Sequence, residues 1–152
     1  MEELIRIYYH SIGHGANLLI NLAPDNTGKI PQCDADRLLE MTEEMKRRFC
    51  CPLFEGTGQG TSVTWDLHGE TRFNHLILME DISQGERVKG YQLKALTQDG
   101  WKTIIGDGIA IGHKKIDRFD TVTATKLLFE CTACDAEPLL RSVRAYYVED
   151  RS

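Results

Sequence analysis

From residue 62 onward the sequence is a series of short segments rich in β-branched and aromatic residues, each bounded by turn signals. Asp99-Gly100 and Asp107-Gly108 predict tight hairpins, because type I′ turns need positive φ at both central residues. Short strands at this spacing are typical of an antiparallel sandwich. We therefore expect a mostly β protein, an antiparallel jelly-roll β-sandwich, with strands at residues 62–67, 73–79, 88–97, 101–106, 109–119, 126–131 and 139–148.

The first 49 residues carry a different pattern. Residues 17–22 form an apolar run without alternation, which is typical of a strand buried on both faces of a parallel sheet. Apolar residues then recur at helical spacing from the expected N-cap, Asp34, as far as Phe49. Lys46-Arg47-Arg48 lie where the helix dipole favours cations. Residues 1–49 are therefore predicted to form one βα unit that precedes the sandwich.

The two patterns divide the chain into three parts. Residues 50–61 contain one proline and three glycines and are predicted to be a linker, and residues 62–152 are predicted to be the sandwich. The strand at 17–22 finds no parallel partner strand within the chain. Its apolar edge implies that another chain covers it, that it pairs with the same segment of a second copy in a dimer, or that it adapts its conformation.

The composition is that of a globular protein. The chain has 152 residues, of which 41% are hydrophobic and 27% charged, so one domain, or one domain plus a short appendage, with a buried core is expected rather than disorder. The net charge is -5 and no block of basic residues occurs, so the sequence offers no cluster of Lys and Arg that would bind nucleic acid. No apolar run reaches the length of a membrane span, and the acidic start Met1-Glu2-Glu3-Leu4 shows no secretory signal.

The cysteine and histidine patterns give little support for a metal site. The five cysteines are an odd number and are expected to be free thiols. Cys131 and Cys134 with Cys50 and Cys51 could supply four thiolates to zinc, but adjacent cysteines seldom bind one ion, and core packing of Cys131 is the favoured interpretation. The five histidines form no H-x-x-x-H or H-E-x-x-H pair, so no metal and no cofactor are predicted.

Several motifs follow one another along the chain, and they are specific only in combination. The first is Gly15-Ala16-Asn17-Leu18-Leu19-Ile20-Asn21-Leu22-Ala23-Pro24-Asp25, followed by Gly28 and Ile30. The later ones are Phe73-Asn74, Glu80-Asp81-Ile82, Gly85-Glu86-Arg87-Val88, Asp99-Gly100-Trp101-Lys102, Ile111-Gly112-His113-Lys114-Lys115-Ile116-Asp117-Arg118-Phe119, and the stretch from Cys134 to Leu140 around Pro138. In this order they resemble the C-terminal portion of bacterial and plant-like α-L-fucosidases of glycoside hydrolase family 29.

The resemblance implies the end of a (β/α)8 barrel followed by a discoidin-like, galactose-binding-type jelly roll. It also implies that the family's nucleophilic Asp and general acid lie on earlier barrel strands, which this chain does not contain. A retaining glycosidase needs two carboxyls about 5 to 5.5 Å apart, and one βα unit cannot position them. The chain is therefore expected to be the non-catalytic C-terminal portion of an enzyme that hydrolyses terminal α-L-fucosyl residues with retention, in a family often periplasmic, secreted or lysosomal.

The resemblance and the residues together suggest few contacts with sugar and no catalytic residue. Asn21 and Asp25 correspond to the barrel-end loop, although Asp25 is more simply a turn residue that bonds its own backbone. The candidate carbohydrate-binding residues at the loop ends are Trp65, His68, Arg72 and Glu80, although core packing is the favoured interpretation of Trp65.

The expected partners follow from the same comparison. A fucosylated glycan is expected to be met through the parent enzyme, and residues 17–22 are expected to mediate self-association. An autonomous carbohydrate-binding or protein-interaction module is the alternative function.

Overall fold

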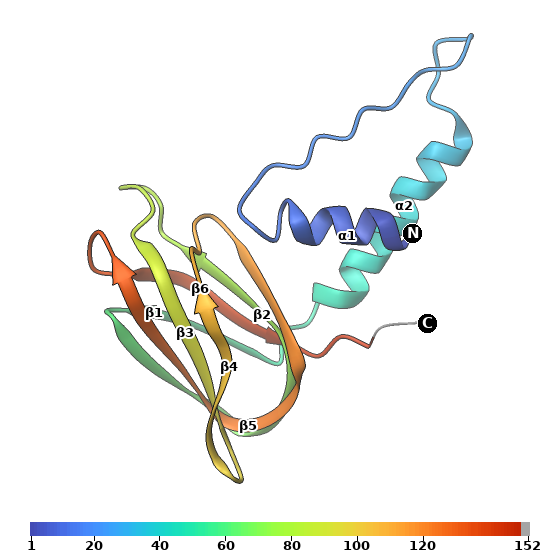
Figure 1. Ribbon diagram of the computed structural model, residues 1–152. Helices are drawn as coiled ribbons and strands as arrows, with labels where there is room; N and C mark the ends of the chain where they lie inside the picture. The colour runs from blue at the N-terminus through green and yellow to red at the C-terminus, as the bar shows by residue number, and fades with distance from the viewer. Residues whose placement is uncertain (150–152) are drawn as a thin grey trace.

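The computed structural model describes residues 1–149 and places two helices beside a strongly bent antiparallel sheet (Figure 1). The helices are α1 (Glu2–His10) and α2 (Gln32–Phe49). The strands are β1 (Phe54–Gln59), β2 (Ser62–Glu80), β3 (Val88–Thr97), β4 (Gly100–Gly108), β5 (Lys115–Cys134) and β6 (Leu139–Tyr146). Their order across the sheet is β1-β6-β2-β5-β3-β4.

The two longest strands turn this single sheet into a sandwich. Strand β2 pairs with β5 along almost its whole length, with irregularities between Asp66 and Thr71 and between Phe73 and His75. Irregularities of this kind bend a strand and increase its twist. The paired strands therefore curve together, and the sheet folds over on itself around one core (Figure 1).

The mostly β sandwich is confirmed, with differences in how its strands are divided. The predicted strands at 62–67 and 73–79 are the two halves of β2, and those at 109–119 and 126–131 both contribute to β5. Residues 109–114 precede β5 as a loop instead of opening a strand. Of the two expected Asp-Gly hairpins, the first is present and joins β3 to β4, which begins at Gly100. The second is absent, because Gly108 ends β4 and a loop follows before β5.

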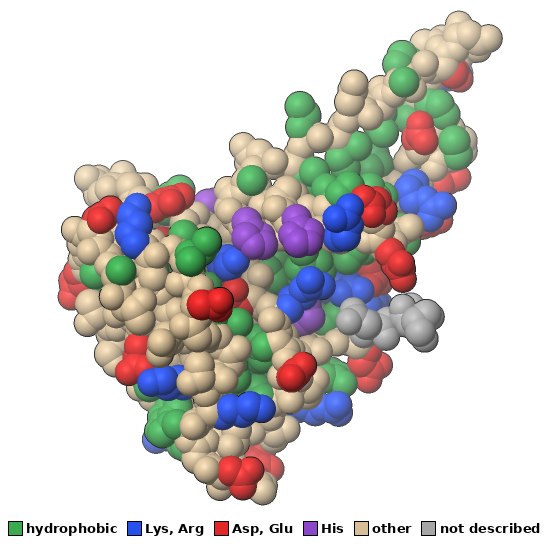
Figure 2. Space-filling model, in the orientation of Figure 1, with side chains coloured by type: hydrophobic (Ala, Val, Ile, Leu, Met, Phe, Trp, Pro, Cys, Tyr) green, Lys and Arg blue, Asp and Glu red, His purple; other side chains and the backbone are tan. Residues whose placement is uncertain are grey.

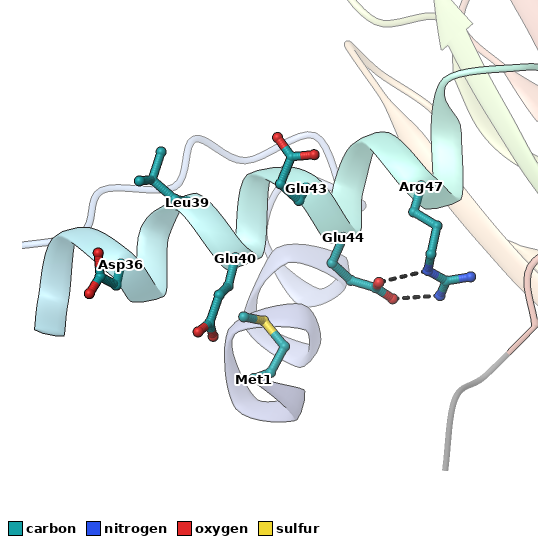
Figure 3. Close-up of a pocket in the computed structure, with 7 residues that line it drawn as sticks. All are labelled: Met1, Asp36, Leu39, Glu40, Glu43, Glu44 and Arg47. Atoms are coloured by element: carbon teal, nitrogen blue, oxygen red, sulfur yellow. Dashed lines mark hydrogen bonds and ion pairs between the residues drawn. The ribbon is translucent and has the colours of Figure 1, made fainter.

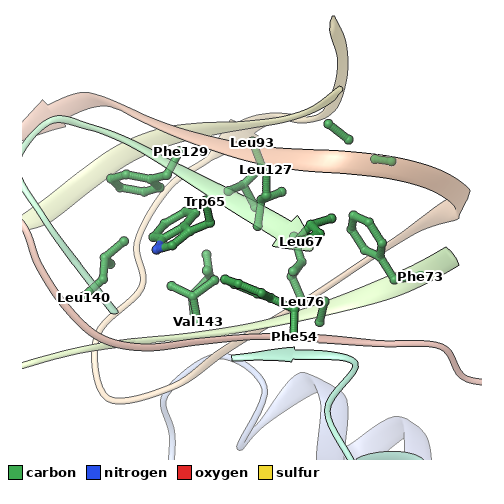
Figure 4. Packing of buried hydrophobic residues seen from close by; sticks show 14 of the residues in the cluster. Phe54, Trp65, Leu67, Phe73, Leu76, Leu93, Leu127, Phe129, Leu140 and Val143 are labelled. Atoms are coloured by element: carbon green, nitrogen blue, oxygen red, sulfur yellow. The ribbon is translucent and has the colours of Figure 1, made fainter. Parts of the chain in front are cut away.

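The main core lies between the two halves of the folded sheet (Figure 4). Side chains of all six strands in the described part of the chain meet there, among them Phe54, Trp65, Phe73, Leu76, Leu93, Leu127, Phe129, Leu140 and Val143. Removing such side chains from water is the main source of stability for a domain of this size.

Strand β1 corrects the prediction of a linker at 50–61. It pairs with β6, from Phe54 opposite Ala145 onward. Its glycines serve packing rather than flexibility, because a Cβ on Gly56 or Gly58 would lie 3.0 Å or 2.9 Å from the indole of Trp65. The predicted boundaries, with the first part ending at residue 49 and the sandwich beginning at residue 62, stay predictions.

Helix α1 packs against the outer face of the sheet, while α2 reaches the sheet only with its C-terminal end and otherwise projects away from it (Figure 1). Helix α2 ends at Phe49 as expected and begins after Pro31, three residues before the predicted start. Helix α1 was not expected from the sequence. The cluster that joins the helices to the sheet consists of Ile5, Tyr9, Ile77, Ile116, Tyr146 and Val148, with Phe49 and Met45 packed against it.

The prediction of a strand at residues 17–22 is wrong for the described structure. The chain is tied to β5 just before this segment, where His14 forms a bridge with Lys115 and the Ile116 amide donates to the Gly13 carbonyl (2.9 Å). Residues 17–22 then run out without ladder bonds toward the start of α2 (Figure 1). A parallel-type strand needs a neighbouring strand, and none of the six strands in residues 1–149 pairs with residues 17–22.

Candidate functional site

The most exposed apolar surface follows the segment between the helices. Leu19 is 92% exposed, and Ile20 and Ile30 are also exposed on the same stretch. In the space-filling view hydrophobic side chains gather along this projection, beyond the sandwich (Figure 2). Leu19 is the most exposed of the large hydrophobic side chains in residues 1–149.

Asp25 organises the turn at the far end of this segment. Its Oδ1 accepts hydrogen bonds from the Thr27 amide (2.8 Å), the Thr27 hydroxyl (2.6 Å) and the Lys29 amide (3.1 Å). These donors, the Thr27 hydroxyl first, lower the pKa of Asp25. The carboxylate therefore has the turn-forming role that was the simpler interpretation, and Asn21 lies exposed four residues before it.

A groove lies where the start of α1 faces α2 (Figure 3). It has a volume of about 580 Å³, and the exposed apolar side chains of Met1 and Leu39 contribute to it. Its full lining is Met1, Asp36, Leu39, Glu40, Glu43, Glu44 and Arg47. The groove is thus acidic by composition.

The carboxylates of this groove are largely paired within α2. Glu44 bridges to Arg47 (2.6 Å) and to Arg48 (2.7 Å), and Glu43 bridges to Lys46 (3.0 Å). Hydrogen bonding from Arg47 lowers the pKa of Glu44 to about 2, with Arg48 acting in the same direction. These pairs satisfy the charges locally, so they stabilise the helix rather than define a cation site.

The four predicted sugar-binding residues do not form one site. Trp65 is buried in the core, and its Nε1 donates to the Thr57 carbonyl (2.7 Å). His68 lies exposed at the irregularity of β2 between Asp66 and Thr71, with φ of 60°, twelve residues from Glu80. Arg72 packs over the ring of Tyr147, with 4.4 Å from its guanidinium carbon to the ring centroid. Carbohydrate binding by His68 and Arg72 stays a prediction, and the burial of Trp65 prevents it from stacking on a sugar.

Glu80 is fully buried and has a structural role. Its carboxylate accepts backbone hydrogen bonds from Arg87 (3.1 Å), Val88 (3.0 Å) and Gly112 (2.9 Å). A buried carboxylate is tolerated when donors surround it in this way. Glu80 therefore joins the loops before β3 and β5 to the end of β2 and is not available to a ligand.

A second buried carboxylate is enclosed by the sandwich. Asp117 accepts a hydrogen bond from the hydroxyl of Tyr91 (2.6 Å), and the ammonium group of Lys115 lies 3.8 Å away. Burial raises the pKa of Asp117 and, together with the charge of Asp117, that of Tyr91. Both groups are inside the protein, so this pair belongs to the core.

The contact between α1 and the sheet includes a polar network that no sequence pattern predicts. Asn74 Oδ1 accepts from the Val148 amide (2.9 Å) and lies 2.8 Å from His75 Nδ1, so Nδ1 carries a proton. His75 Nε2 in turn pairs with the Tyr9 hydroxyl (2.9 Å). The Arg118 guanidinium lies 4.5 Å from the centroid of the Tyr9 ring. The i,i+4 spacing of Ile5 and Tyr9 was the signal available for this buried helix face.

Among residues 1–149, no group of three or more His, Cys, Asp or Glu side chains could hold a metal ion. Neither helix in the same range is long and apolar enough to cross a membrane.

Solved structures are similar to this chain over almost its whole length. A glycoside hydrolase 29 family member from an unknown rumen bacterium is 30% identical, with a TM-score of 0.89, over 99% of this chain and 29% of its own. The chain therefore matches the C-terminal portion of a glycoside hydrolase. No protein-family model matches the chain.

Two further relatives are named as α-L-fucosidases. A Bacteroides thetaiotaomicron structure named as an alpha-L-fucosidase is 38% identical, with a TM-score of 0.92, over 97% of this chain and 34% of its own. A protein of Oryza sativa subsp. japonica, named alpha-L-fucosidase 1, is 25% identical over 90% of this chain and 33% of its own length. The chain corresponds to the C-terminal portion of the α-L-fucosidases of glycoside hydrolase family 29, and it spans about a third of these relatives.

Proposed function

We propose that the chain supplies the non-catalytic C-terminal portion of an enzyme that hydrolyses terminal α-L-fucosyl residues with retention. The observation that carries this proposal is the match of almost the whole chain to about a third of fucosidase relatives. The two buried carboxylates, Glu80 and Asp117, are enclosed by backbone amides and by Tyr91. Neither is placed to act on a glycosidic bond across a shared cleft.

The proposal assigns a role to the exposed segment at 17–22. These residues present Leu19 and Ile20 to solvent beyond the sandwich. Burying such side chains is worth on the order of 1.5 to 3 kcal/mol each, a large gain compared with the net stability of a domain. The segment therefore serves as a contact with another chain, including a second copy of this one, and a fucosylated glycan is met through the assembled enzyme.

The experiment is an assay of the purified chain with an aryl α-L-fucoside. No turnover above the buffer blank is expected, while a full-length family 29 relative assayed in parallel must release the aryl alcohol. Turnover that co-purifies with the chain and persists in an independent preparation would overturn the proposal.

A second measurement separates this role from that of an autonomous binding module. Calorimetric titration with a panel of fucosylated and galactosylated glycans is expected to give no saturable heat. Saturable binding of one glycan would favour the carbohydrate-binding module instead.

A further inference from the structure

Two adjacent cysteines occupy the junction where α2 ends and the chain enters the sandwich. The Cys50 amide donates to the Lys46 carbonyl (2.8 Å) and so closes the last turn of α2. Shortly afterwards the Leu53 amide donates to the Ala145 carbonyl (2.8 Å) beside β6. Between these two anchors, Cys50 and Cys51 are free and exposed, with their Sγ atoms 3.2 Å apart.

We propose that Cys50 and Cys51 form a reversible redox site that closes into a vicinal disulfide, with a low-molecular-weight disulfide as the oxidant. A thiolate of the pair attacks one sulfur of the reagent, which gives a mixed disulfide and releases one thiolate. The other cysteine then loses its proton and attacks the protein sulfur, which closes the S–S bond and releases the second thiolate. Two electrons and two protons pass from the pair, and the reagent leaves as two thiols.

Ring geometry makes this bond easy to reduce. The peptide bonds of the described residues are all trans, so the Cα atoms of Cys50 and Cys51 are about 3.8 Å apart. Ordinary disulfides span Cα distances of about 4.4 to 6.8 Å, and deviation from this range stores strain. Strained and exposed disulfides have the more oxidising potentials and are the labile ones. The pair is therefore suited to respond to redox conditions rather than to staple the fold.

The second close pair of thiols differs in its surroundings. Cys131 Sγ donates to the carbonyls of Gly90 (3.4 Å) and Ala133 (3.2 Å). Burial raises its pKa to about 11, with its contact to Cys134 acting in the same direction. The contact with Cys50 raises the pKa of Cys51 as well, so the difference between the pairs is access: Cys50 and Cys51 are exposed to a disulfide reagent, whereas Cys131 is half-buried. Cys131 and Cys134 thus provide an internal comparison within the same molecule.

Closure at Cys50 and Cys51 acts on the joint between the helices and the sandwich. The preceding residue, Phe49, packs edge-on against Tyr146 of β6 (5.3 Å between ring centroids) and against Tyr9 of α1 (6.1 Å). The eight-membered ring of a vicinal disulfide restricts the backbone directly after this anchor. Oxidation is therefore expected to change how rigidly the helices are held on the sheet.

The test uses the whole chain and oxidised glutathione. Trypsin releases residues 49–72, a peptide that contains Cys50 and Cys51 and no other cysteine. After incubation with oxidised glutathione and blocking with iodoacetamide, this peptide is expected to be lighter than the dithiol by two hydrogen atoms, with no alkyl group and no glutathione. Dithiothreitol must then restore two alkylatable thiols.

Two variants make the outcome decisive. Cys50→Ser removes the second nucleophile, so Cys51 is expected to retain glutathione as a stable mixed disulfide, whereas Cys33→Ser is expected to behave as the unmodified chain. The decisive peptide is residues 49–72 from the chain without substitutions, after treatment with oxidised glutathione. The proposal is overturned if this peptide carries two alkyl groups, keeps glutathione on either cysteine, or is linked to another peptide.

Discussion

Gly106 and Gly108 lie two residues apart on β4 but have different neighbours. A Cβ on Gly108 would lie 2.4 to 2.6 Å from atoms of the Tyr91 ring, whereas a Cβ on Gly106 would lie 3.7 Å from Thr103. The Tyr91 ring is fully buried, and its hydroxyl is held by Asp117 (2.6 Å), so it cannot move aside. We expect Gly108→Ala to lower the free energy of unfolding by about 1 to 3 kcal/mol.

Urea unfolding of both alanine variants checks this expectation. Gly106→Ala is the matched control and is expected to change the free energy of unfolding by no more than about 0.5 kcal/mol. Equal losses for the two variants would show that glycine is needed for the strand backbone and not for the Tyr91 ring.

At the scale of single residues, the sequence predicted which chemical groups are present better than whether those groups are buried or exposed. Glu80 and Trp65 have the right groups to contact a sugar, yet each is enclosed by partners distant in the chain, such as Gly112 for Glu80. No local pattern shows that a carboxylate will meet amides from two loops. Asp25 was predictable as a turn residue, because its partners lie within four positions.

At the scale of the secondary-structure elements, the pairing of Glu44 with two arginines makes the stability of α2 depend on pH. The folded protein lowers the pKa of Glu44 from 4.5 to about 2, so its contribution is present above pH 4.5 and is lost as the pH falls toward 2. We expect Glu44→Gln to lower the free energy of unfolding by about 1 kcal/mol at pH 7. Near pH 2 the variant and the unmodified chain should be equally stable.

Urea unfolding between pH 2 and pH 7 measures this difference. Glu43→Gln is the control, because Glu43 pairs with Lys46 on the exposed surface of the same helix and is expected to matter little at any pH. A Glu44→Gln deficit that stays constant down to pH 2 would contradict the assignment to its ionised form.

The elements predicted correctly are those whose signals are local and periodic. Alternation predicted β3, and helical spacing with cations at the end predicted α2. Strand β1 was missed because Gly56 and Gly58 signal flexibility in sequence, while in the fold they make room for Trp65. Helix α1 was missed because its buried face rests on Ile5 and Tyr9 alone, over nine residues.

At the scale of the whole molecule, the chain combines a sandwich whose apolar core is buried with a helical region that leaves apolar side chains exposed. The sandwich was predictable because its core partners are all within the chain. The apolar run at 17–22 signals burial just as strongly, yet the described structure leaves Leu19 and Ile20 exposed. A sequence records that a segment is apolar, but the partner that covers it need not be encoded in the same chain.

This exposed segment leads to a prediction about association. We expect the intact chain to self-associate, with a mass from light scattering that rises above the monomer value as concentration increases. The double variant Leu19→Asp with Ile20→Asp should remain monomeric, because charge on the segment removes the apolar contact. Ile109→Asp is the matched control, since Ile109 is 74% exposed in the loop between β4 and β5, and it should associate like the intact chain. A monomeric intact chain whose amides at 17–22 resist hydrogen exchange would contradict this prediction, because the segment would then have joined the sandwich.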